Sequence, residues 1–271
     1  MTADPFEGIL DETRSTPLGA RTALLSDAKR GWVPIRKTFV QHANTAATRP
    51  SVLGALVSGR LELALDALLI LHALMPVLPG SPLPLSTWAD LLATKGVPNT
   101  AVTSRVLRNL QKRGLLTYAT VGKYAEVIPK MEDGSGHDWV KAGSVAEHGP
   151  GYFTIPYDYW TTDLVNRLGL PGKAMLLVSL AETSKKPSFP MAVERAQEWY
   201  GFSERTAERG FSQLSAENLL QVHIQKVNDN RVPGGVRRIY HRALRAPYSM
   251  QHRATLQQTA QAAAQAQAAT P

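Results

Sequence analysis

Residues 99–116 read NTAVTSRVLRNLQKRGLL, and residues 202–220 read FSERTAERGFSQLSAENLL. Each stretch contains a small polar residue that can cap a helix, continues for about four turns with arginine on one face, and ends in Gly or Asn before Leu-Leu. Each is followed by a short strand, a basic glycine-containing loop and a second strand. This order is typical of a DNA-recognition helix followed by a β-wing. Two copies predict a chain that contacts DNA at two adjacent places.

A helical projection at about 100° per residue separates the two faces of each stretch. The residues expected to face a core are Val102, Val106 and Leu110 in the first copy, and Ala207, Gly210, Phe211 and Leu214 in the second. An ordinary amphipathic helix with a solvated basic face would explain either stretch alone. The repetition of the whole helix–strand–loop–strand order favours recognition helices.

The expected DNA-binding side chains are those that can hydrogen-bond base edges in a major groove or contact phosphates. In the first copy they are Asn99, Thr100, Ser104, Arg105, Arg108, Gln111 and Lys112, with Lys123 in the wing. In the second copy they are Ser203, Arg205, Thr206, Arg209 and Ser212, with Arg231, Arg237 and Arg238 in the wing.

The positive charge of the chain is concentrated around these two copies. The 271 residues carry a formal net charge of +8, with an isoelectric point near 9.8. Residues 95–131 hold seven basic side chains and one acid, and residues 219–253 again hold seven and one. Such local clusters are expected for phosphate contact, whereas a generic basic protein would spread its charge.

Several classes of protein are excluded by what the sequence lacks. The chain has no cysteine, which excludes disulfides, cysteine-ligated zinc and thiol catalysis and fits a reducing cytoplasm. Its first residues lack the basic start and apolar run of a signal peptide. The most apolar segment, residues 61–78, has too short an uncharged core to span a bilayer. We expect a cytoplasmic, nucleoid-associated protein without a membrane partner.

No constellation of residues predicts an enzyme. Residues 169–174 resemble a phosphate loop, but two residues rather than four separate the glycines, and Ala follows the Lys. The seven histidines show no metal-ligand spacing. The spacing is also wrong for a strand-cutting recombinase built on His241, Arg245 and Tyr248. We therefore expect no catalytic residue, no metal site and no cofactor.

The predicted fold is mainly α with small β-wings, arranged as two tandem winged helix-turn-helix domains. The expected divisions are an N-terminal, partly disordered arm (1–48), a first winged helix (49–130), a linker (131–151), a second winged helix (152–246) and a Gln/Ala-rich tail (247–271). Strands are predicted at 32–40, 115–120, 124–128, 152–156, 219–227 and 235–243. Residues 52–75, apolar on nearly every face of a predicted helix, form a candidate homodimer interface.

The predicted second unit carries the patterns FTIPxxYW (153–160), LPGKAMLL (170–177) and EWYGFSxxTA (198–207). These motifs resemble a winged helix found in actinobacterial proteins, several of which have only a generic helix-turn-helix label. The two-unit layout over roughly residues 50–250 is similar to tandem winged-helix plasmid replication initiators, and to regulators with the same duplication. The resemblance implies a winged-helix fold and double-stranded DNA as the partner.

Three functions fit these observations. A sequence-specific transcriptional regulator of chromosomal or mobile-element genes is favoured; a plasmid-type replication initiator that binds repeated origin sites is the first alternative. A winged-helix adaptor between proteins is the second, and the clustered positive charge argues against it.

A linker of about twenty residues could span tens of ångströms, and one DNA turn is about 34 Å. Both recognition helices are therefore expected to enter successive major grooves.

Overall fold

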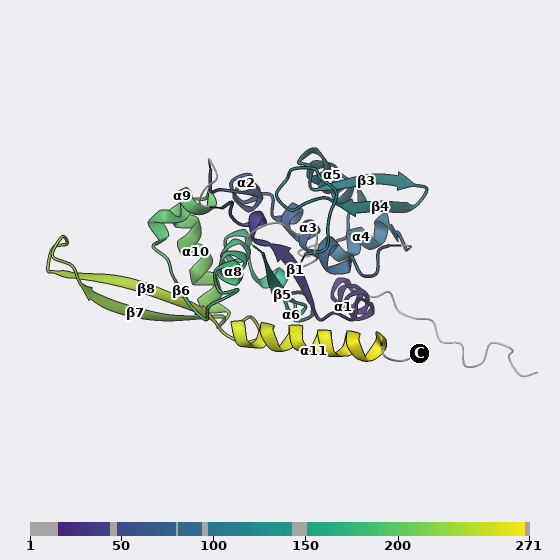
Figure 1. Ribbon diagram of the computed structural model, residues 1–271. Helices are drawn as coiled ribbons and strands as arrows, with labels where there is room; N and C mark the ends of the chain where they lie inside the picture. Colours follow the sequence, from purple (N-terminus) through teal and green to yellow (C-terminus); the bar gives the residue numbers. More distant parts are fainter. Residues whose placement is uncertain (1–15, 44–47, 80, 94–96, 143–150, 269–271) are drawn as a thin grey trace, which may run out of the picture.

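The computed structural model describes residues 16–43, 48–79, 81–93, 97–142 and 151–268 (Figure 1). The helices are α1 (Pro17–Asp27), α2 (Val52–Ser58), α3 (Glu62–Leu74), α4 (Leu85–Leu92), α5 (Thr100–Lys112), α6 (Asp158–Thr161), α7 (Leu164–Arg167), α8 (Leu170–Glu182), α9 (Ala196–Tyr200), α10 (Glu204–Ala216) and α11 (Met250–Ala268). Two 3-10 helices are η1 (Lys37–Phe39) and η2 (Val193–Arg195). The strands are β1 (Trp32–Arg36), β2 (Leu83–Pro84), β3 (Leu116–Val121), β4 (Tyr124–Pro129), β5 (Tyr152–Pro156), β6 (Phe189–Pro190), β7 (Leu220–Asn228) and β8 (Val236–Leu244). The chain is thus mixed α/β, with small antiparallel sheets.

Two segments repeat the same order of elements. Residues 62–129, here called the first unit, run α3–β2–α4–α5–β3–β4. Residues 170–244, the second unit, run α8–β6–η2–α9–α10–β7–β8. Their three-stranded sheets also correspond, with strand orders β2-β4-β3 and β6-β8-β7. In both, a two-residue strand pairs with the last strand of a hairpin.

Local sequence signals set the helices and hairpins of both units. The side chain of Asn99 accepts a hydrogen bond from the Val102 amide (3.0 Å), and that of Ser203 accepts one from the Thr206 amide (3.3 Å). These bonds confirm the two predicted N-caps. After α5 the chain reverses at Gly114, whose φ of +70° suits a residue without a Cβ. The predicted hairpin strands are confirmed to within a residue or two, whereas the short strands β2 and β6 were not predicted because two residues show no alternation.

The two units share one hydrophobic core and are not joined only by a linker. Strand β1 pairs with β5, and a Cβ built on Gly54 of α2 would lie 2.3 Å from the Tyr200 carbonyl oxygen of α9. Within the expected linker, Glu132 is buried and accepts a hydrogen bond from Arg36 Nη1 at 2.7 Å. Residues 131–142 are therefore packed against the rest of the chain, and the prediction that they form an extensible linker between the units is wrong. Residues 143–150 lie outside the described ranges.

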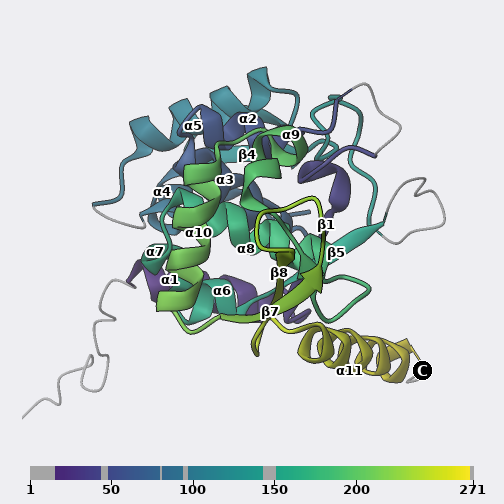
Figure 2. The ribbon, with the colours of Figure 1, turned by 90° about the vertical axis from the view of Figure 1, so that its left-hand side faces the viewer.

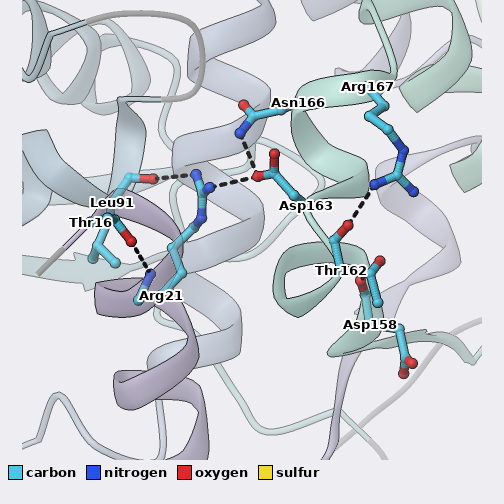
Figure 3. Close-up of polar contacts among 9 residues, drawn as sticks. Thr16, Arg21, Leu91, Asp158, Thr162, Asp163, Asn166 and Arg167 are labelled. Carbon is cyan, nitrogen blue, oxygen red and sulfur yellow. Dashed lines mark hydrogen bonds and ion pairs between the residues drawn. The ribbon is translucent and has the colours of Figure 1, made fainter.

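The N-terminal arm is folded where the structure describes it. Helix α1 buries Arg21, whose Nη2 donates to Asp163 Oδ1 (2.9 Å) and whose Nη1 donates to the Leu91 carbonyl (3.4 Å), as Figure 3 shows. A buried guanidinium needs such partners, and here they come from α4 and from the residue that precedes α7. The expectation of disorder is wrong for residues 16–30, and the strand predicted at 32–40 is present as β1 but ends at Arg36, where η1 follows. Residues 1–15 and 44–47 lie outside the described ranges.

The Gln/Ala-rich segment is not a free tail, because α11 packs along β5. Arg253 is buried and donates to the carbonyls of Leu180 (3.2 Å) and Thr183 (2.9 Å) at the end of α8. A cation at a helix C-terminus satisfies carbonyls that have no partner within the helix. Gln257 Nε2 adds a hydrogen bond of 2.6 Å to Thr154 Oγ1. One buried arginine thus replaces the apolar stripe that the segment lacks.

The candidate dimer interface at residues 52–75 is covered by the chain itself. Every side chain from Ala64 to Leu74 is buried, including Asp66 and His72. The exposed residues in the range are the small ones at 55, 58 and 59 and the charged Arg60. The apolarity of α3 therefore reflects its central place in the monomer, and the prediction of a dimer surface there is wrong. In the described ranges, no helix combines the length and apolarity needed to cross a bilayer.

Candidate nucleic-acid interface

Helix α5 presents an uninterrupted basic face. Arg105, Arg108 and Lys112 are exposed on it, together with Gln111 and Thr100, and residues 100–112 contain no acid. Within the part of the chain that the structure describes, no ion pair is formed by these three cations. Arg108 and Lys112 border a hollow on the α4 side of the helix and another on the β3 side. Arg105, Arg108 and Lys112, here called the basic ridge, are therefore accessible from both sides of the helix.

The inward face of α5 differs from the predicted one. Thr103, Ser104, Leu107 and Leu110 are buried, whereas Val102 and Val106 are only half-buried. Helix α5 contacts α3, α4 and β3, so its covered sector is wider than a single apolar stripe. Ser104, one of these buried residues, was predicted to bind DNA, and that assignment is wrong.

Ser104 has a structural role instead. Its Oγ lies 3.1 Å from the hydroxyl of Tyr118, which donates a hydrogen bond to it. This bond joins α5 to β3 and keeps the serine side chain away from solvent. The other expected residues of the first copy are exposed, although the Asn99 side-chain oxygen is already used as the helix cap.

The β3–β4 hairpin carries one exposed cation at its turn. Lys123 is exposed, and its ammonium lies 5.5 Å from the centroid of the Tyr124 ring. Its backbone carbonyl accepts a hydrogen bond from the Leu85 amide at the start of α4 (3.0 Å). The turn is thereby tied to the helix that precedes α5, which places Lys123 beside the basic ridge.

Helix α10 divides its exposed face by charge. A projection at about 100° per residue puts Arg205 and Arg209 on one edge, Ser212 near the middle, and Glu204 and Glu208 on the other edge. All five side chains are exposed. This helix therefore lacks the uniform charge of α5, a difference that the count of basic residues could not reveal.

The first-turn hydroxyls of α10 are engaged with each other. Ser203 Oγ and Thr206 Oγ1 lie 2.9 Å apart within hydrogen-bonding distance, and Thr206 is only half-exposed. Both residues were expected to contact DNA. In the structure both side chains lie at the N-terminal cap of α10, where they hydrogen-bond within the helix's own first turn.

The acidic edge of α10 borders a groove along β8. Glu194 of η2 lines the groove together with Glu204 and Glu208, and the rings of Phe211 and Tyr240 also belong to its lining. Arg237, Arg238 and Arg242 line the same groove, so it carries both charges. Sequence reasoning missed this groove because its walls come from three separate parts of the second unit.

The β7–β8 hairpin projects from the body as an arm, to the left in Figure 1 and toward the viewer in Figure 2. Arg231, Arg237 and Arg238 are exposed on it, and Arg237 Nε lies 3.6 Å from Asp229 Oδ2. In Figure 1 the β3–β4 hairpin points in the opposite direction. The basic side chains expected in the second wing are thus accessible.

Two cations counted in the second basic cluster are not accessible. Arg242 is buried at the base of the arm, where its guanidinium lies 4.1 Å from the centroid of the Phe211 ring and donates to the Met191 carbonyl. Burial lowers its pKa, and burial also lowers the pKa of Arg253 to about 10. The accessible positive charge of residues 219–253 is consequently smaller than the sequence suggests.

Apolar side chains also remain exposed along the arm. Val222, Ile224, Val236 and Tyr240 are 39 to 47% exposed. Their register continues the face that Leu244 buries at the base of the arm. An alternating strand pattern predicts a covered face, but no element of the described chain covers this part of the hairpin.

No group of three or more histidine, aspartate or glutamate side chains among the described residues is arranged to hold a metal ion.

Comparisons of the chain with protein-family models, with curated proteins and with solved structures found no match. The interpretation of the two units accordingly depends on their own geometry and charge.

Proposed function

We propose that the two units are winged helix-turn-helix modules and that the chain binds double-stranded DNA sequence-specifically. The shared order of a helix, a short strand, two helices and a hairpin supports the first part, as does the common strand order of the two sheets. The observation that carries the second part is the basic ridge of α5, with three exposed cations and no acid.

The first unit is proposed as the reader of sequence. One helix fits a B-DNA major groove, and arginine is the side chain that pairs bidentately with guanine. Arg105 and Arg108 lie on the ridge where base edges would come closest, with Gln111 beside them. Lys112, at the C-terminal end of the ridge, and Lys123, in the neighbouring hairpin, suit phosphate contact, which positions a protein without specifying sequence.

The second unit is proposed as a backbone clamp. Glu204 and Glu208 would repel phosphates, so α10 can approach DNA only along its Arg205–Arg209 edge. The arm extends Arg231, Arg237 and Arg238 farther from the body. Contacts of this kind add affinity on any sequence.

A rigid relation between the units replaces the flexible linker in this proposal. The shared core and the β1–β5 pairing hold α5 and α10 in one arrangement. Removing residues 152–271 would take away β5 and much of that core, so a truncation cannot report on the second unit alone. Substitutions in the full chain are the appropriate test.

The biological role that we propose is transcriptional regulation. Replication initiation at repeated origin sites would use the same DNA-binding surface and remains the alternative. Genome-wide mapping of bound DNA separates the two, because a regulator should occupy promoters and an initiator should occupy direct repeats at an origin.

A protein-adaptor function is favoured by one specific observation. Exposed apolar side chains at Val222, Ile224 and Val236 lie along the arm, and no element of the described chain covers them. An apolar surface of this kind suits contact with a protein better than contact with phosphate. This function is compatible with DNA binding through the first unit, since the two surfaces belong to different elements.

The test of the proposed function uses the full chain and a DNA site selected from a random pool. Arg105→Ala and Arg108→Ala should each weaken binding to the selected site by about 1–3 kcal/mol. Arg195→Ala is the matched control, because this exposed arginine is already paired with Glu198 at 2.5 Å. Equal losses on random DNA would reassign the ridge to backbone contact, and no loss would overturn the proposal.

A further inference from the structure

A pocket rich in lysine lies between the N-terminal segment and the second unit. Its lining includes Lys37 of η1, Lys185 and Lys186 after α8, Ser184, and Tyr200 of α9. The cavity volume is about 390 Å³, which is within the usual range for small-ligand pockets. None of these residues belongs to the DNA-binding set described above.

The lysines of this pocket are incompletely neutralised. Burial lowers the pKa of Lys37, and the like charge of Lys185 lowers it further, followed by those of Lys186 and Arg253. Glu182, the carboxylate that lines the pocket, opposes this effect but is shared: it accepts a hydrogen bond from the Tyr200 hydroxyl (3.2 Å) and pairs with Lys186 at 3.7 Å. In the described ranges, Lys37 and Lys185 have no ion pair.

The three lysines share one lining carboxylate, that of Glu182. An anion with several acceptor oxygens would pair with more than one of these lysines at once.

We propose that this pocket binds a small phosphorylated ligand, with its phosphate held by Lys37 and Lys185. Free phosphate and the phosphate of a nucleotide share this chemistry. Lys37 is half-buried within the pocket, so a DNA backbone would reach the exposed Lys185 and Lys186 but not all three lysines. The bound ligand bridges η1, α8 and α9, which makes the pocket an effector site at the junction between the N-terminal segment and the second unit.

The test uses the full-length protein without DNA. Inorganic phosphate, pyrophosphate and AMP are titrated by calorimetry and by thermal unfolding against sodium chloride of equal ionic strength. At least one probe should bind and raise Tm. Lys37→Gln and Lys185→Gln should each weaken it at least about tenfold, as expected when a charged hydrogen bond is lost. Lys141→Gln, at an exposed lysine outside the pocket, should leave binding unchanged.

Three results would overturn the proposal. The first is that no probe binds above the salt control. The second is that Lys185→Gln, an exposed change that should not impair folding, leaves probe affinity unchanged. The third, measured in a separate band-shift titration with DNA, is that the lysine substitutions weaken DNA binding without changing probe binding, which would make the cluster a DNA contact. Because the probes are titrated without DNA, neither of the first two results bears on the proposed DNA binding.

Discussion

The ammonium of Lys173 on α8 lies 2.8 and 2.6 Å from the two carboxylate oxygens of Asp66 on α3, and both side chains are buried. Glu62 approaches the same ammonium at 2.9 Å. This cluster joins the first helix of one unit to the first helix of the other. It also explains the Gly-Lys pair that resembles a phosphate loop in the sequence, because this lysine is an internal ion-pair partner and is shielded from any nucleotide.

Removal of Lys173 should therefore destabilise the whole protein. Lys173→Met leaves Asp66 buried without this cation, and breaking a buried pair costs about 3–5 kcal/mol. Urea unfolding would measure the loss. The double variant Lys173→Met/Asp66→Leu should be more stable than the single one, because the buried Asp66 carboxylate is removed and Glu62, which also loses its cation, is partly exposed to solvent. A single variant as stable as the parent would contradict this account.

The close contact between α8 and α10 leaves no room for a side chain at Gly210. A Cβ at this position would lie 2.3 Å from Met175 Cγ and 2.4 Å from the Pro171 carbonyl oxygen. Gly210→Ala should lower the free energy of unfolding by about 1–3 kcal/mol through overpacking. At Gly169 the nearest atom would be 3.4 Å away, so Gly169→Ala is the steric control and should cost less than Gly210→Ala, its loss being limited to the weaker helix cap that alanine provides. Equal effects of the two changes would contradict the packing described for α10.

His72 should make the stability depend on pH. Burial lowers its pKa from 6.5; Glu132 raises it by a smaller amount, and Arg36 lowers it. Neither ring nitrogen has a hydrogen-bond partner in the described ranges. The unfolded chain therefore takes up a proton more readily, so this contribution to stability is present above pH 6.5 and is lost as the pH falls below it.

The measurement is the free energy of unfolding between about pH 7.5 and pH 5. His72→Leu should reduce the slope against pH, because the group whose pKa is lower in the folded than in the unfolded state is gone. His137→Leu, at an exposed position, is the control and should retain the parent slope. An unchanged slope in the His72 variant would show that other groups cause the loss.

Arg253 should be required for the docking of α11. Arg253→Ala leaves the carbonyls of Leu180 and Thr183 without their donor and should cost about 1–3 kcal/mol. Gln258→Ala, at an exposed position of the same helix, should change stability by less than about 0.5 kcal/mol. Hydrogen exchange would show whether α11 amides lose protection together, and full protection in the Arg253 variant would contradict the role of this contact.

DNA binding should depend strongly on salt. If the basic ridge and the hairpins contact several phosphates, affinity should fall at least about tenfold between 50 and 200 mM salt. Lys123→Gln should weaken binding to all sequences alike and reduce the salt slope by about one unit. Glu204→Gln/Glu208→Gln should instead raise affinity, because it removes repulsion from α10. A flat response to salt in a band-shift titration would remove the main support for phosphate contact.

Much of the local structure could be predicted from the sequence because its causes are local. The caps at Asn99 and Ser203, the glycine-containing turns and the alternating hairpin strands each depend on a few neighbouring residues. The repeated order of elements follows from the same signals. The exposure of Arg105, Arg108 and Lys112 also followed from the helical period, since these long charged side chains could be placed only on the solvent side.

Only the tertiary structure decided which polar residues are buried and how the units are joined. Ser104 became internal because α5 is covered on more than one side, which a single apolar stripe does not reveal. Arg21, Arg242 and Arg253 are buried because carbonyls or a carboxylate distant in the sequence satisfy their guanidinium groups. The helical period specifies the direction of a side chain, but whether that direction leads to solvent, to a carbonyl or to a partner charge depends on segments that only folding brings together.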